Sequence, residues 1–226
     1  MPSTLKDRLD HVQGEIAQAS RDHSHAVRLV VVTKSAPRQI FSELAQLGVT
    51  DLGENRVQGA SERLAGFEDR FRWHFIGHLQ SNKARAAVAL FDVFHGVDSL
   101  ALLQRLDRVA GELGRQPELL LQVNVSGETS KSGLAPDALN DVLAASTQLQ
   151  HARVTGLMTM APRNPEVETT RPIFRQLAQL AALKRQKAPA LTELSMGMTE
   201  DFVVAIEEGA TVVRIGRKIV SSDSLS

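Results

Sequence analysis

Residues 27–34 read VRLVVVTK, a run of branched apolar side chains that ends in a lysine. Branched apolar residues favour β-strands, and a continuous rather than alternating run is typical of a strand that is buried on both faces. Seven further runs of strand length follow toward the C-terminus. They are Val49–Gly53, Arg72–Gly77, Val93–Val97, Glu118–Val125, Arg153–Met160, Glu193–Gly197 and Thr211–Gly216. The sequence therefore predicts eight strands, of which VRLVVVTK is the first.

Segments with apolar side chains at helical spacing lie before the first of these strands and between them. We expect helices at Thr4–Ala19, Pro37–Leu47, Ser81–Leu90, Ser99–Leu113, Pro136–Leu149, Glu168–Leu183 and Thr199–Glu208. Several of them begin with Ser, Thr or Pro, which favour the first turn of a helix. Gly114 and Gly209 stand where helix C-terminal caps are expected.

Regular alternation of strand and helix predicts parallel strands joined by right-handed crossovers. Eight such units in 226 residues fit one small α/β domain over residues 1–226, a (β/α)8 barrel of the TIM type. An open, doubly wound sheet is the alternative fold. Few residues follow the eighth strand, so its helix must be short. We expect the N-terminal helix at Thr4–Ala19 to cover the gap that this leaves.

The composition excludes several classes of protein. Hydrophobic residues make up 42% and charged residues 23%, and 26 basic residues balance 26 acidic ones, so no net charge indicates a nucleic-acid or membrane partner. Cysteine is absent, which rules out disulfides, cysteine nucleophiles and iron–sulfur clusters. No apolar run reaches the roughly 20 residues that span a bilayer, and the N-terminus is polar. These features predict a soluble cytoplasmic protein, and the few aromatic residues predict a monomer.

Function in a barrel of this kind resides at the C-terminal ends of the strands and in the loops after them. Lys34 ends the first strand, where partial burial would favour the neutral amine. A neutral amine can attack an aldehyde to form a Schiff base. The alternative is a lysine at the rim that forms an ion pair with Glu54 or Asp51.

The loops after the seventh and eighth strands are suited to an anion. Barrel enzymes often bind phosphate there through backbone N–H groups and a helix N-terminus. The residues that favour such a site are Ser195, Gly197, Thr199, Arg214, Gly216 and Arg217. The alternative is that Gly197 and Gly216 are ordinary turn glycines.

A phosphate site on strands seven and eight, facing Lys34 across the barrel mouth, would accept a small phosphorylated aldehyde. Pyridoxal 5′-phosphate (PLP) has that shape, and Arg214 lies where a partner for its pyridine nitrogen is needed. His74 and His78 are four residues apart, but on a strand, and no third ligand is close in sequence. We therefore expect no metal site.

Short motifs along most of the chain carry a family resemblance. They are VVTKSAP around Lys34, LGENRVQ around Asn55, WHFIGHLQSNK at 73–83, VNVSGETSKSGL at 123–134, GLMTMAP from 156, LSMGMTEDF from 194 and VVRIG ending at 216. With these motifs in this order, the chain resembles the pyridoxal phosphate homeostasis proteins, a family of single-domain barrels that bind PLP. The WHFIG-LQSNK and LSMGM-T-D spacings are the most specific of them.

The resemblance implies a barrel similar to the N-terminal domain of alanine racemase. It implies that Lys34 holds PLP as an internal aldimine and that the role is PLP homeostasis, as a carrier or buffer without established catalysis. Apo-PLP enzymes are the possible acceptors. Asn55 is then near the ring, Arg214 is near the pyridine nitrogen, and Ser195, Gly216 and Arg217 bind the phosphate.

The chain departs from the family pattern at four positions. The family usually has proline at His78, an aromatic residue at Arg56, threonine at Arg217 and glycine at Ser221. The loss of the threonine hydroxyl removes one phosphate contact, which the charged Arg217 could replace. His78 could change the environment at the edge of the ring.

Two enzymatic functions are the alternatives to a carrier. A PLP-dependent racemase needs two bases on opposite faces of the cofactor, and the second base of that fold is a tyrosine from another domain. This chain has no tyrosine, and only His78 could take its place. The other alternative is a phosphosugar enzyme that uses Lys34 for aldol chemistry. Lys131, in a Ser-Lys-Ser-Gly loop, is a candidate amine for the transit of PLP into or out of the site.

Overall fold

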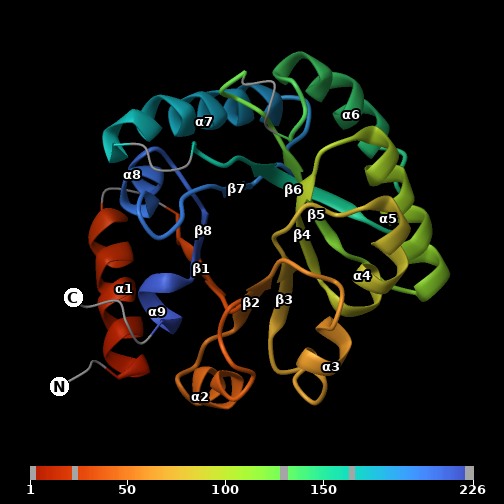
Figure 1. The fold of residues 1–226 in the computed structure, drawn as a ribbon. Helices are drawn as coiled ribbons and strands as arrows, with labels where there is room; N and C mark the ends of the chain where they lie inside the picture. Colours follow the sequence, from red (N-terminus) through yellow and green to blue (C-terminus); the bar gives the residue numbers. More distant parts are fainter. Residues whose placement is uncertain (1–3, 22–24, 128–131, 163–165, 222–226) are drawn as a thin grey trace.

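Eight parallel strands close into a barrel in the computed structural model, which describes residues 4–21, 25–127, 132–162 and 166–221 (Figure 1). Each strand pairs with the next, and β8 returns to pair with β1. This closure confirms the barrel and excludes the open sheet. The strands are β1 (Arg28–Val32), β2 (Asp51–Glu54), β3 (Arg72–Phe75), β4 (Val93–Val97), β5 (Glu118–Gln122), β6 (Arg153–Met158), β7 (Glu193–Ser195) and β8 (Val212–Ile215).

Helices surround the barrel on the outside (Figure 1). They are α1 (Leu5–Ala19), α2 (Ile40–Gln46), α3 (Ala60–Leu64), α4 (Ala84–Leu90), α5 (Leu100–Leu113), α6 (Leu139–Ser146), α7 (Arg171–Arg185), α8 (Phe202–Glu207) and α9 (Arg217–Val220). Short 3₁₀ turns, η1 (Ser81–Lys83), η2 (Pro136–Ala138) and η3 (Val167–Thr170), precede α4, α6 and α7. All seven predicted helices are present, whereas the short α3 was not predicted.

The first helix completes the outer ring as predicted. Thr4 begins it with a capping box, in which its hydroxyl accepts from the backbone N–H of Asp7 and the Asp7 carboxylate accepts from the N–H of Thr4. The buried side of α1 contacts α8 and α9, and Figure 1 shows this red helix beside the blue C-terminal ones. The helix therefore covers the place where α9, with only four residues, is too short.

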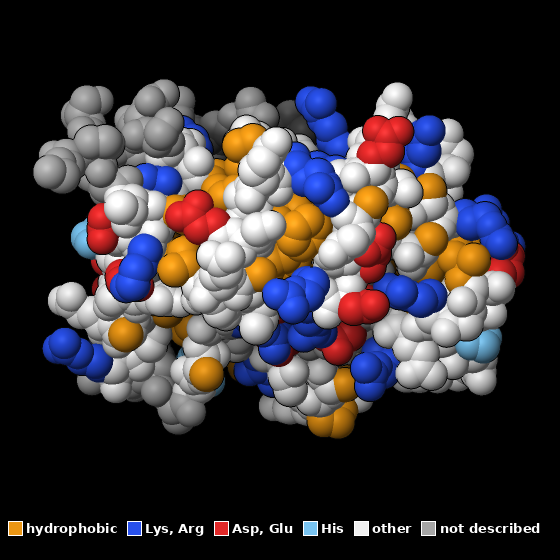
Figure 2. All heavy atoms as spheres, turned by 90° about the horizontal axis from the view of Figure 1, so that it is seen from below, with side chains coloured by type: hydrophobic (Ala, Val, Ile, Leu, Met, Phe, Trp, Pro, Cys, Tyr) orange, Lys and Arg blue, Asp and Glu red, His pale blue; other side chains and the backbone are white. Residues whose placement is uncertain are grey.

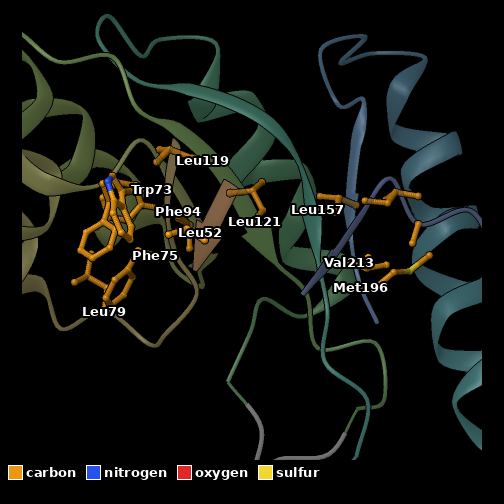
Figure 3. Packing of buried hydrophobic residues seen from close by; sticks show 14 of the residues in the cluster. Leu52, Trp73, Phe75, Leu79, Phe94, Leu119, Leu121, Leu157, Met196 and Val213 are labelled. Atoms are coloured by element: carbon orange, nitrogen blue, oxygen red, sulfur yellow. The ribbon is translucent and has the colours of Figure 1, made fainter. Parts of the chain in front are cut away.

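The hydrophobic core lies mainly between the barrel and the helices. Because side chains alternate along a strand, Trp73 and Phe75 of β3 point outward into this layer, while His74 between them points into the barrel. Figure 3 shows Trp73, Phe75 and Leu79 packed together in the layer. The barrel interior holds a small apolar cluster of Val93, Leu120 and Met158. It also holds buried polar side chains, among them His74, His95, Ser195 and Arg214.

Charged side chains begin six of the eight strands. They are Arg28, Asp51, Arg72, Glu118, Arg153 and Glu193. Arg28 lies 3.9 Å from Asp51 and 3.6 Å from Glu193, and Glu118 lies 2.5 Å from Arg72 and 3.6 Å from Arg153. These ion pairs join neighbouring and more distant strands at the N-terminal end of the barrel.

The exposed surface carries few large apolar side chains in the part of the chain that the structure describes. Figure 2 views the molecule from below and shows some hydrophobic surface near the middle of that face, with lysine and arginine side chains beside it. The most exposed large apolar residues come from different segments: Leu100, Met160, Val167, Leu183 and Met198. None of the described helices has the length and hydropathy needed to cross a membrane.

Candidate functional site

Lys34 lies two residues beyond β1, at the C-terminal end of the barrel, and its side chain is exposed. The partial burial that the sequence predicted for this amine is therefore absent. Lys34 and Asn55 line one cavity of about 250 Å³, together with Glu54, Gly59 and Arg63. The structure thus brings the predicted lysine and the predicted ring contact to the same hollow.

The two carboxylates that could have paired with Lys34 have other partners. Glu54 accepts a hydrogen bond from the Thr33 hydroxyl at 2.7 Å and one from Arg63 at 3.0 Å. Asp51 lies at the opposite end of its strand, next to His74. Among the described residues, Lys34 forms no ion pair with either of these carboxylates.

Arg63 of α3 holds the segment that carries Lys34. Its guanidinium donates to the carbonyl oxygens of Thr33 and Ala36, at 2.7 and 2.8 Å, on either side of the lysine. It also lies over the Phe41 ring, 5.0 Å from the centroid. Sequence reasoning missed this residue because α3 is too short to show a helical period and the contact spans about thirty positions.

The loops after β7 and β8 pack tightly against neighbouring backbone. Gly197 has φ +90°, and a Cβ there would lie 2.6 Å from the Cβ of Ala205 and 2.9 Å from the Cα of Phe202. A Cβ on Gly216 would lie 3.0 Å from the carbonyl oxygen of Val32, the last residue of β1. Gly197 is therefore required both by close approach and by its positive φ, and a Cβ on Gly216 would make a tight contact with β1.

The loop after β8 lies beside Lys34 and not across the mouth from it. In the closed barrel β1 and β8 are hydrogen-bonded neighbours, with Val31 opposite Ile215. The sequence expectation of a phosphate site facing the lysine across the opening is wrong on this point, because closing the sheet places the first and last strands together.

Acidic side chains adjoin this loop region. Arg217, the first residue of α9, is exposed and pairs with Glu200 at 3.0 Å. Asp201 is buried and accepts from the backbone N–H of Met198 at 2.6 Å, and burial raises the pKa of its carboxyl. An anion at this end of the barrel would therefore compete with Glu200 for Arg217.

Arg214 and Ser195 point into the barrel. The Arg214 guanidinium donates to the Ser195 hydroxyl and, at 3.2 Å, to the carbonyl oxygen of Thr159, which follows β6. Burial lowers the pKa of Arg214 to about 10. No carboxylate in the described residues lies within ion-pair distance of this guanidinium. Ser195 is fully buried, and its hydroxyl also contacts the ring nitrogen Nδ1 of His95 at 2.7 Å.

Two buried histidines extend these contacts, and sequence reasoning did not assign them. His95 Nε2 lies 2.9 Å from His74 Nδ1, and His74 Nε2 lies 2.8 Å from an oxygen of Asp51. Burial lowers the pKa of both histidines, most strongly that of His95. The available signal was the placement of each histidine between apolar neighbours, in WHF and FHG, on consecutive strands.

The remaining sequence candidates lie apart from this cluster. His78 is on the surface and contacts Asp98 at 3.1 Å, so it and His74 do not converge. No group of three potential metal ligands occurs among the residues that the structure covers. Lys131 lies outside the described residues.

Comparison with known families and proteins gives consistent matches. Residues 8–221 match the family described as alanine racemase, N-terminal domain. A protein of Aquifex aeolicus named pyridoxal phosphate homeostasis protein is 37% identical, and the match covers 92% of each chain. A protein of the same name from Pseudomonas aeruginosa is 39% identical, with 95% of this chain and 94% of that one covered.

Solved structures match over the whole barrel. PipY of Synechococcus elongatus without PLP has a TM-score of 0.88 and 40% identity, with 96% of this chain and all (100%) of that chain covered. The structure of PipY with PLP bound has a TM-score of 0.85 and 39% identity over the same shares, 96% and 100%. Diaminopimelate decarboxylase from M. jannaschii, at 13% identity and a TM-score of 0.77 over 96% of this chain and 59% of its own, shares the fold alone.

Proposed function

The chain belongs to the pyridoxal phosphate homeostasis protein family, and on that premise we propose that it binds PLP and acts in intracellular PLP homeostasis as a carrier or buffer. One observation carries the placement of the cofactor. The exposed amine of Lys34 follows β1, and the adjacent strand β8 leads directly into Gly216 and the start of α9. PLP bears its aldehyde and its phosphate arm on adjacent ring carbons, so it needs an amine and an anion site side by side.

The donors at this end of the barrel fit the cofactor. The amine of Lys34 condenses with the aldehyde carbon and one water leaves, which is the chemistry that PLP supplies. Gly216 allows close backbone approach, and the first turn of the short α9 offers N–H groups that suit a phosphate. Gly197 shapes the neighbouring loop, and Arg217 adds a positive charge once the phosphate displaces Glu200 from it.

The two remaining assignments concern the ring. Asn55 shares the cavity of Lys34 and is proposed to contact the ring edge. Arg214 is proposed as the partner of the pyridine nitrogen, which its positive charge keeps unprotonated. We propose that Ser195 acts through Arg214 and not through the phosphate, because its hydroxyl accepts from the guanidinium and donates to His95.

A carrier fits these residues better than a racemase. The 226 residues contain no tyrosine, and His78, the remaining candidate for a second base, is an exposed side chain paired with Asp98. An exposed Lys34 leaves bound PLP open to exchange with other amines, as a carrier requires. We therefore propose a cytoplasmic monomer without catalytic turnover, with apo-PLP enzymes as acceptors.

The test is a visible spectrum and an intact mass after borohydride reduction, on protein soaked with PLP. Wild type and a Lys83→Ala control, which changes another exposed lysine near the barrel end, should turn yellow and gain the mass of one reduced PLP group. Lys34→Ala should do neither. A wild-type protein that stays colourless refutes the function, and an adduct that persists in Lys34→Ala refutes the attachment point.

Lys131 stays a prediction as a transit amine. If it relays PLP, Lys131→Ala should slow the transfer of PLP to an apo-PLP enzyme while the visible spectrum of the loaded protein is unchanged. Unaltered transfer kinetics would remove this lysine from the pathway.

A further inference from the structure

A continuous line of hydrogen bonds crosses the barrel interior beneath the proposed PLP site. It joins Asp51, His74, His95, Ser195 and Arg214, which come from β2, β3, β4, β7 and β8. The first three contacts measure 2.8, 2.9 and 2.7 Å. Every member is buried, and the most exposed, Asp51, shows only 7% of its surface.

The two charged ends fix the direction of every hydrogen bond in this line. Asp51 only accepts, so His74 must donate from Nε2 and keep Nδ1 as an acceptor. His95 then donates from Nε2 to His74 and accepts at Nδ1 from the Ser195 hydroxyl. The Ser195 oxygen is left to accept from the Arg214 guanidinium, which only donates. Each side chain therefore donates once toward Asp51, and no other arrangement with neutral histidines satisfies all four contacts.

The two ends of the line lie at opposite ends of the barrel. Arg214 reaches the carbonyl of Thr159, just beyond β6 at the C-terminal end. Asp51 begins β2 at the N-terminal end and lines a cavity of about 460 Å³ there, together with Arg28 and Gln13. The line thus connects the proposed cofactor end of the barrel to a cavity at the far end.

We propose that Asp51, His74, His95 and Ser195 are positioning residues that orient the Arg214 guanidinium through this one-directional relay and couple its hydrogen bonding to the N-terminal end of the barrel. The inference deepens the proposed function, since it assumes that Arg214 faces the pyridine nitrogen. A merely structural role would satisfy the same polar groups but would leave the visible band of bound PLP unmoved. The histidine tautomers therefore test whether the relay exists, and the spectrum of bound PLP tests whether it positions Arg214.

The charged groups around the histidines favour their neutral forms as a set. His74 faces Asp51 and lies near Arg28 and Arg72, while His95 faces His74 and lies near Arg214. Two arginines, Arg28 and Arg72, oppose a positive charge on His74, and Arg214 joins them against one on His95. Asp51 favours a positive charge on His74. A neutral pair is what the relay requires, because a protonated His95 could not accept from Ser195.

The first experiment uses the ligand-free protein and so does not depend on PLP. Long-range ¹H–¹⁵N NMR of histidine rings reports which nitrogen carries the proton. The relay predicts that His74 and His95 are both neutral at pH 7 and both protonated on Nε2, with resonances assigned by His74→Gln and His95→Gln. A Nδ1–H tautomer or a charged ring at either position overturns the relay.

The second experiment measures the signal at the cofactor. His95→Phe keeps a ring and removes both nitrogens, and Phe94→Leu is its control, because it changes the neighbouring buried ring that points away from the interior. We expect His95→Phe to shift the visible band of bound PLP or its pH profile and to weaken PLP binding by up to about tenfold, the upper end of what one lost hydrogen bond contributes. Phe94→Leu should leave both unchanged.

Ser195→Ala serves as a second variant should His95→Phe not fold, and it should move the same band. Unchanged spectra and affinities in the folded relay variants overturn the inference while PLP binding itself stands. Equal changes in Phe94→Leu overturn it as well, because the effect would then be general loosening of the barrel. If wild type shows no PLP band, the proposed function fails, and the tautomers in the ligand-free protein still decide the relay.

Discussion

The two interior histidines predict how the stability of the fold depends on pH. Burial lowers the pKa of His74 and of His95 in the folded protein, against an ordinary value of 6.5. In the unfolded chain each ring takes up a proton as the pH falls through about 6.5, whereas the folded rings take up theirs only at lower pH. At mildly acidic pH the unfolded chain therefore binds more protons than the folded protein does, so acidification favours unfolding.

The magnitude follows from the number of protons. Each proton bound only by the unfolded chain changes the free energy of unfolding by about 1.4 kcal/mol per pH unit. Two histidines give a fall of about 2.7 kcal/mol per pH unit below pH about 6, until the folded rings begin to titrate. That is a large share of the roughly 5–15 kcal/mol that stabilises a typical domain.

Carboxylates change the total pH dependence of the free energy of unfolding, but they change it equally in wild type and in a histidine variant. Burial raises the pKa of Asp201, so its folded form holds a proton that the unfolded form has lost, and its contribution opposes that of the histidines on acidification. Burial alone would raise the pKa of Asp51, but hydrogen bonds from His74 and Thr50 outweigh it and lower that pKa, so its stabilisation is lost only below pH about 4.

The assay is urea unfolding of ligand-free protein at pH 7.5, 6.5 and 5.5, for wild type and for single variants. His95→Phe should remove about 1 kcal/mol from the change in unfolding free energy between pH 6.5 and 5.5, where the unfolded ring goes from half to almost fully protonated, whatever it does to stability at pH 7.5. Phe94→Leu, which changes a neighbouring buried ring without a titratable group, should leave the slope unchanged. Equal slopes in wild type and His95→Phe would refute the neutral, buried pair.

Three further substitutions test the packing and the site. In thermal melts, Gly156→Ala should destabilise the fold by about 3 kcal/mol or prevent folding, because its Cβ would lie 2.1 Å from the carbonyl oxygen of Glu193. Gly14→Ala is the matched control on α1, where a Cβ would meet open space, and it should stabilise the fold by about 0.5–1 kcal/mol. Arg63→Leu should lower the free energy of unfolding in urea by about 2 kcal/mol, since the segment around Lys34 loses both carbonyl contacts. It should also raise the dissociation constant of PLP. An unaltered PLP affinity would show that Arg63 does not position the amine of Lys34. Arg214→Glu should shift the visible band of PLP-loaded protein, and an identical spectrum would remove this arginine from the ring nitrogen.

The strands could be predicted because each is a local property of the sequence. Runs such as VRLVVVTK and ELLLQVNV are apolar, branched or leucine-rich, and bounded by turn residues, so they indicate strands without knowledge of their neighbours. Their ends were less predictable. The strand expected to reach Val125 ends at Gln122, because beyond it the backbone pairs in an isolated bridge between Val123 and Leu134. That pairing depends on a loop whose path the sequence does not indicate.

The residues of the candidate site also divide into those that local sequence predicts and those that only the folded barrel brings together. Lys34 and the two glycines were found because their positions at strand ends are visible in the sequence, but the exposure of the lysine depends on what surrounds it. Arg63 was missed because its partners lie about thirty positions away. His95 and Ser195 are a hundred positions apart and meet only because the barrel closes.

Closure of the barrel also explains why one set of residues can link both ends of the molecule. A closed barrel of eight strands encloses an interior that side chains can just fill. Here hydrogen-bonding side chains fill much of it, and they cost stability unless every donor and acceptor is satisfied. A fully apolar interior would avoid that cost, yet it could not orient a buried guanidinium that has no carboxylate beside it within the described residues. The polar interior is therefore best understood as support for Arg214, and the acid sensitivity of the fold is the consequence of building that support from two neutral histidines.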